Sequence, residues 1–77
     1  MMYEVMIRFK IVRNNEYLEV CLDSRLSFKD NLKILSELID MDLKDMNIYD
    51  PIKKMFLDKE TPIAEFNINY FISLQLF

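Results

Sequence analysis

The first residues of the chain alternate between apolar and polar with a period of two. One face of residues 3–12 carries Tyr3, Val5, Ile7, Phe9 and Ile11, and the other carries Glu4, Met6, Arg8 and Lys10. This alternation predicts a strand with one core face and one face in water. Residues 13–16 suit a tight turn, because Asn14 and Asn15 tolerate positive φ better than other residues except glycine. A second alternating segment over 17–23 completes a predicted antiparallel hairpin.

The pattern then changes to the spacing of a helix. Ser27 followed by Asp30 resembles a capping box, with Asp in place of the usual Glu or Gln. The apolar stripe that follows consists of Phe28, Leu32, Leu35 and Ile39, with Leu38 beside them. We therefore expect a helix from about Phe28 to Asp40 that lies across the apolar face of the hairpin.

The second half of the chain has weaker signals. Residues 41–50 are predicted to be a connector, anchored by Leu43 and by either Ile48 or Tyr49, with Met41 and Met46 filling the core. Pro51 is expected to open a third strand over 52–57, whose register stays open because both alternating sets mix apolar and charged residues. Residues 58–62 form a turn, and residues 72–77 alternate again as a closing strand.

The order of these elements constrains the topology. A helix that follows two strands must cross one face of the sheet, and the last strand can then enter the centre beside the first strand and parallel to it. The chain is thus predicted to be one α+β domain over residues 1–77. Its sheet is mixed and four-stranded, in the order 2-1-4-3, with one helix packed across one face, which is the β-grasp arrangement.

Over almost its whole length the chain resembles ubiquitin-like proteins. Residues 65–68 (Glu-Phe-Asn-Ile) are similar to the acidic-aromatic-Asn-Ile turn of that family, and residues 73–76 are similar to its alternating last strand. The segment 18–20 is similar to the second strand as it approaches the helix. The resemblance implies that Phe66 packs under the loop before the last strand.

The chain departs from ubiquitin in three respects. Phe77 is expected to end the last strand itself and to leave no flexible tail. The sequence ends at Phe77 without the Gly-Gly pair of conjugated family members, so we expect neither protein conjugation nor a sulfur-carrier role. The segment between Phe56 and Ile63 is shorter than in ubiquitin, so we also expect a short fourth strand of the family to be lost.

A ubiquitin-like protein of this length without a glycine tail resembles the YukD/EsaB-like family. Those bacterial proteins accompany the type VII (WXG100) secretion machinery as accessory or regulatory components. The resemblance implies a cytoplasmic, non-enzymatic module that binds a protein partner, which could be the cytoplasmic part of the membrane secretion machine.

Composition excludes several other classes. The chain has no His and no Gly, which removes His-dependent catalytic triads, imidazole metal sites and the glycine-rich nucleotide loops. A net charge of −3 disfavours nucleic acid as a partner. Cys21 is the only cysteine, which fits a reducing compartment, and no apolar run is long enough for membrane insertion. We expect no enzyme activity, no cofactor and no metal.

The sheet face away from the helix is the expected binding surface. The exposed apolar residues predicted there are Met6 and Phe77, and Arg8 and Lys54 are expected to form a basic rim. Met, aromatic residues and Arg are enriched at protein interfaces, which favours this assignment. The alternative function is a self-associating, homodimeric β-grasp domain unrelated to secretion, joined through a sheet edge or through the Phe77 face.

Overall fold

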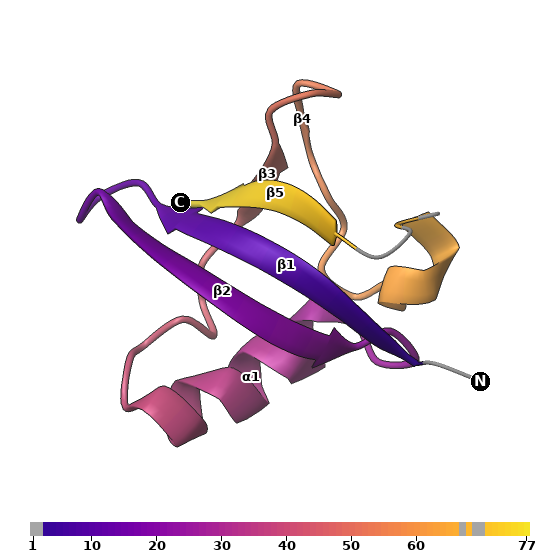
Figure 1. The fold of residues 1–77 in the computed structure, drawn as a ribbon, viewed down its shortest axis with the longest axis horizontal. Coiled ribbons are helices and arrows are strands. Elements are labelled where there is room, and N and C mark those ends of the chain that lie inside the picture. Colours follow the sequence, from indigo (N-terminus) through magenta and orange to yellow (C-terminus); the bar gives the residue numbers. More distant parts are fainter. Residues whose placement is uncertain (1–2, 67, 69–70) are drawn as a thin grey trace.

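The structure is a computed structural model that describes residues 3–66, 68 and 71–77. Its elements are β1 (Glu4–Ile11), β2 (Glu16–Asp23), α1 (Phe28–Ile39), β3 (Ile48–Asp50), β4 (Met55–Phe56), the 3₁₀ helix η1 (Ile63–Phe66) and β5 (Phe71–Leu76). The strands form one sheet in the order β2-β1-β5-β3-β4, and β5 runs parallel to β1. Figure 1 shows α1 covering one face of this sheet.

The predicted hairpin is confirmed. β1 and β2 pair antiparallel from Glu4 opposite Asp23 to Ile11 opposite Glu16. Asn15 has a φ of 55°, as the turn chemistry requires. Val5, Ile7, Phe9 and Ile11 are buried, whereas Tyr3, which was predicted on the same face, is 39% exposed before the strand begins.

The helix begins where the sequence predicts. The Ser27 hydroxyl accepts a hydrogen bond from the Asp30 backbone N–H at 3.1 Å, which caps the first turn. Phe28, Leu32 and Leu35 are buried against the sheet. The prediction is wrong for the last turn, because Ile39 and Leu38 are 37% and 77% exposed. Figure 1 shows this end of α1 extending away from the strands, so its apolar side chains have little to pack against.

The third strand predicted over 52–57 is confirmed only at residues 55 and 56, which form β4. The Asp50 carboxylate accepts hydrogen bonds from the backbone N–H groups of Ile52 and Lys53, and the Asp50 carbonyl accepts one from Lys54. These bonds fold 51–54 into a turn, with Ile52 82% exposed, instead of a strand. The sheet therefore has five strands instead of four, because β3 forms before this turn, within the predicted connector, and β4 forms after it.

The core lies between α1 and the sheet and continues under the connector. Leu43, Met46 and Ile48 are buried there, and Met41 packs partly buried against them, so the predicted core role of both methionines is confirmed. The Phe66 ring lies 5.9 Å from that of Phe28, which places it against the start of α1. Asn67, which belongs to the family-like turn, lies outside the described residues.

Candidate functional site: the open face of the sheet

The strand register determines which side chains reach the open face. Residues that lie directly opposite each other on paired strands point to the same face. Tyr49 of β3 is opposite Gln75 of β5 and opposite Phe56 of β4, so these three side chains share a face. Gln75 is paired with Lys10 on β1, which extends the same face toward β2. This face lies opposite the buried residues Ile48 and Leu76, so it is the one that α1 leaves open.

Three aromatic rings gather at the β3–β4 end of the open face. The rings of Tyr49 and Phe56 lie 5.1 Å apart, and each lies 5.9 Å from the ring of Phe77. All three pairs are edge-to-face, the arrangement that aromatic quadrupoles favour. We call Tyr49, Phe56 and Phe77 the aromatic cluster.

The aromatic cluster is fixed in position and still accessible. The backbones of Phe77 and Asn47 exchange two hydrogen bonds, of 2.9 and 2.8 Å, which continue the β3–β5 ladder beyond Leu76. Phe56 and Phe77 are nevertheless 56% and 49% exposed. Rigid aromatic side chains offer a large contact area with little loss of conformational entropy on binding, so this cluster is suited to contact another protein.

The β1–β2 side of the open face carries cations stacked on an aromatic ring. The Arg8 guanidinium carbon lies 4.6 Å from the centroid of the Tyr17 ring, and Lys10 Nζ lies 5.8 Å from it. Such stacking holds the flexible Arg8 side chain against the sheet. Met6 is 39% exposed at the far end of β1, where its sulfur contacts that of Cys21.

The four residues predicted for the site do not form one patch. Met6 is level with Phe71, and Phe77 follows six positions later (71 to 77), so Met6 and Phe77 lie roughly 20 Å apart along the strands. Phe77 belongs to the aromatic cluster and Arg8 lies between the two ends. Lys54 was expected on a strand but lies in the turn that joins β3 to β4, with a φ of 56°. It is exposed beside β4.

Sequence reasoning missed Tyr49 and Phe56 as members of the site. The sequence signal that could have identified them is the pair Asp50-Pro51, because Asp at the first and Pro at the second position are typical of a tight turn. A turn at residues 51–54 implies one strand before it and one after it, and in that hairpin Tyr49 lies opposite Phe56.

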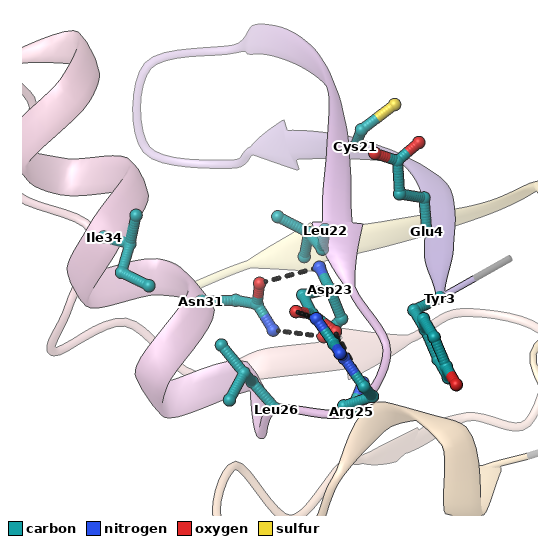
Figure 2. Close-up of a pocket in the computed structure, with 9 residues that line it drawn as sticks. All are labelled: Tyr3, Glu4, Cys21, Leu22, Asp23, Arg25, Leu26, Asn31 and Ile34. Atoms are coloured by element: carbon teal, nitrogen blue, oxygen red, sulfur yellow. Dashed lines mark hydrogen bonds and ion pairs between the residues drawn. The ribbon is translucent and has the colours of Figure 1, made fainter.

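A hollow lies at the other edge of the sheet, between the end of β2 and the start of α1. Figure 2 shows Tyr3, Asp23, Arg25 and Asn31 around it. The Arg25 guanidinium binds the Asp23 carboxylate at 2.8 and 3.0 Å and lies 4.4 Å from the Tyr3 ring centroid. The side-chain hydrogen bonds lower the pKa of Asp23 and raise that of Arg25. A further hydrogen bond from the Arg25 backbone N–H also lowers the pKa of Asp23.

The described residues contain neither a candidate metal site nor a candidate membrane-spanning helix. Within residues 3–66, 68 and 71–77, no group of three or more Cys, Asp or Glu side chains is arranged to hold a metal ion. Among the same residues, no helix has both the length and the apolar character needed to cross a membrane. The predicted absence of enzyme activity and cofactors stays a prediction.

Comparison with known proteins gives the fold. No protein-family model matches the sequence, and no curated protein matches it. Solved structures do match: a de novo design based on ubiquitin has a TM-score of 0.74 and 16% identity, over 100% of this chain and 90% of that chain.

Two further structures match over nearly their whole length. One, described as molecular mimicry of SUMO that promotes DNA repair, has a TM-score of 0.82 and 9% identity, over 100% of this chain and 94% of that chain. The ubiquitin-like domain of Plasmodium falciparum Dsk2 has a TM-score of 0.68 and 16% identity, over 96% of this chain and 99% of that chain. The chain therefore has the ubiquitin-like β-grasp fold.

Proposed function

We propose that this protein is a non-enzymatic interaction module that binds a protein partner through the aromatic cluster on the open face of its sheet. The observation that carries the proposal is the convergence of Tyr49, Phe56 and Phe77 from three different strands or strand ends. Exposed aromatic groups held rigidly at the centre of a contact are the residues that most often dominate binding energy. The fold itself, which is that of protein-interaction modules, agrees with this role.

The charged residues predicted for the site are assigned supporting roles. Arg8, stacked on Tyr17, lies on the same face and is proposed to meet acidic groups at the rim of the contact. Lys54 is proposed to do the same from the β3–β4 turn. Charges at a rim mainly change the rate of association and its dependence on salt. Met6 lies too far from the aromatic cluster to share its centre and is proposed to extend the contact toward β2.

We further propose that the partner is the cytoplasmic part of a type VII secretion machine. The support for this proposal is the resemblance of the sequence to the YukD/EsaB-like family. The fold and the matched structures do not identify a particular machine. A gene for a WXG100 substrate beside one for an FtsK-like ATPase, next to the gene of this protein, is the expected finding. Direct binding to the purified cytoplasmic region of that ATPase would then test the proposal.

The test of the binding face compares single substitutions by affinity capture of the partner. Phe56→Ala and Phe77→Ala are each expected to reduce the affinity about tenfold or more, because each removes a central aromatic contact. The matched control is Leu38→Ala, which removes an apolar side chain that is 77% exposed near the end of α1, away from the aromatic cluster. Equal binding by all three variants would show that the aromatic cluster is not the binding surface.

A further inference from the structure

β2 is an outer strand of the sheet, and half of its backbone groups point away from β1. The Ser24 N–H donates to the Tyr3 carbonyl at 2.6 Å, and Tyr3 and Ser24 continue the β1–β2 register. Hydrogen-bonded pairs alternate along an antiparallel ladder, so Leu22, Val20 and Leu18 bond to β1. The N–H and C=O groups of residues 17, 19, 21 and 23 therefore point outward.

One end of this edge is already occupied. The Asn31 side chain accepts a hydrogen bond from the Asp23 N–H at 3.0 Å and donates one to the Asp23 carbonyl at 2.9 Å, as Figure 2 shows. The amide thus takes the place of one residue of a neighbouring strand. For residues 17, 19 and 21, no such outward partner occurs in the described part of the chain.

The rest of the edge lacks proline, lysine and a short length, and its charged side chains are the acidic Glu16 and Glu19. Outer strands are commonly shielded by Pro, by Lys or by a short length. β2 is eight residues long, with the sequence Glu-Tyr-Leu-Glu-Val-Cys-Leu-Asp. It therefore offers the outward groups of residues 17, 19 and 21 to another extended chain.

We propose that a second copy of this chain pairs antiparallel with β2, centred on Val20. In this register Val20 faces Val20 of the second copy and Leu18 faces Leu22 of the second copy, all on the helix side of the sheet. On the open side, Glu19 faces Cys21 of the second copy. The four hydrogen bonds of the two central pairs use only residues 19 and 21, so Asn31 does not have to release Asp23.

The neighbouring registers are less favourable. A pairing centred on Glu19 places two carboxylates opposite each other, and one centred on Cys21 places Glu19 opposite Asp23 of the second copy. Like charges directly opposite are destabilising. A pairing centred on Leu18 puts Val20 opposite Glu16. The register centred on Val20 alone matches apolar with apolar residues and avoids like charges, which favours a second copy as the occupant.

The helix beside this edge also has apolar residues without cover. Ile34 is 49% exposed and lines the hollow next to Cys21 and Leu22, and Leu38 follows one turn later at 77% exposed. Antiparallel pairing about a two-fold axis keeps both helices on the same side of the joined sheet, so these residues would extend the contact between the copies. The aromatic cluster lies at the opposite edge and stays free to bind its partner.

The test uses proline at a position whose N–H points out of the sheet. Glu19→Pro removes one outward donor and leaves the β1 ladder intact, because an edge strand accepts proline there. Glu19→Ala is the matched control, since it removes the charge and keeps the N–H. In sedimentation over a dilution series, wild type and Glu19→Ala are expected to reach twice the mass of one chain, whereas Glu19→Pro stays at one chain with an unchanged circular dichroism spectrum.

Disulfide trapping tests the register. Val20→Cys in a Cys21→Ser background is expected to cross-link to itself, because the two Cα atoms would lie about 4.5 Å apart. Leu18→Cys in the same background, and Cys21 alone, should not cross-link. A wild-type protein that stays at one chain at every concentration overturns the proposal, even if the edge then binds a foreign peptide. So does a dimer that persists in Glu19→Pro or is trapped through Cys21.

Discussion

Arg25 lies at the end of β2 and contacts both Asp23 and Tyr3. Its guanidinium forms two hydrogen bonds with the Asp23 carboxylate and lies over the Tyr3 ring. The charged form of Asp23 is favoured in the folded chain, first by these side-chain hydrogen bonds and second by the Arg25 backbone N–H. The pKa of Asp23 therefore lies below its ordinary value of 3.8.

This lowered pKa predicts the sign of a pH effect on stability. A carboxyl whose pKa falls on folding stabilises the folded state above its unfolded pKa and loses that contribution as the pH falls through its folded pKa. The free energy of unfolding should therefore drop from pH 7 to pH 2, and the drop should be smaller in Arg25→Ala. Urea unfolding at the two pH values measures it, and an equal or larger drop in the variant would contradict the assignment.

Single residues also show where sequence patterns stop being informative. Ser27 was predicted as the helix cap because Asp30 follows it three residues later, at the spacing of a capping box. Asn31 was not singled out, since a polar residue on an apolar stripe gives no sign of which backbone groups it will meet. Its role depends on the exact height at which α1 crosses the end of β2, which is a property of the packed structure.

At the scale of elements, the two four-residue turns have the same design without any glycine. Each ends in a residue with positive φ, Asn15 at 55° and Lys54 at 56°. Asn adopts this conformation readily, whereas Lys does so at a cost of about 1 kcal/mol. The β3–β4 turn therefore stores a small amount of backbone strain that the hydrogen bonds of Asp50 offset.

Lys54→Gly should relieve this strain and raise the free energy of unfolding by about 0.5–1 kcal/mol. Lys53→Gly is the matched control, because Lys53 is not among the described residues with positive φ and should gain nothing from the change. Chemical denaturation of the two variants measures the difference. If Lys53→Gly stabilised the protein as much as Lys54→Gly, strain at Lys54 would not be the cause.

Elements with a clear period were predictable, and those without one were not. The hairpin and the closing strand were predicted because each alternates over six residues or more. β3 and β4 contain three and two residues, which is too few for a period to be seen. Their positions follow from the Asp50 turn and from pairing with β5, which lies far away in the sequence.

At the scale of the whole molecule, the order of elements was enough to predict the topology. A helix after a hairpin and a last strand parallel to the first leave few arrangements, and the observed order β2-β1-β5 is the predicted one, followed by two short strands, β3 and β4, where one was predicted. The open face, and the presence of Phe77 on it, could be predicted from this topology. The aromatic cluster did not, because it requires the register of three strands at once.

The most direct test of the central claim maps the binding face residue by residue. In ¹⁵N-labelled protein titrated with its captured partner, the largest changes in amide chemical shift are predicted at the aromatic cluster, at Asn47 and Gln75, and in the β3–β4 turn. Changes should be small on the outer face of α1, at Lys33 and Glu37. Changes concentrated on α1 or along β2, with the aromatic cluster unaffected, would contradict the account.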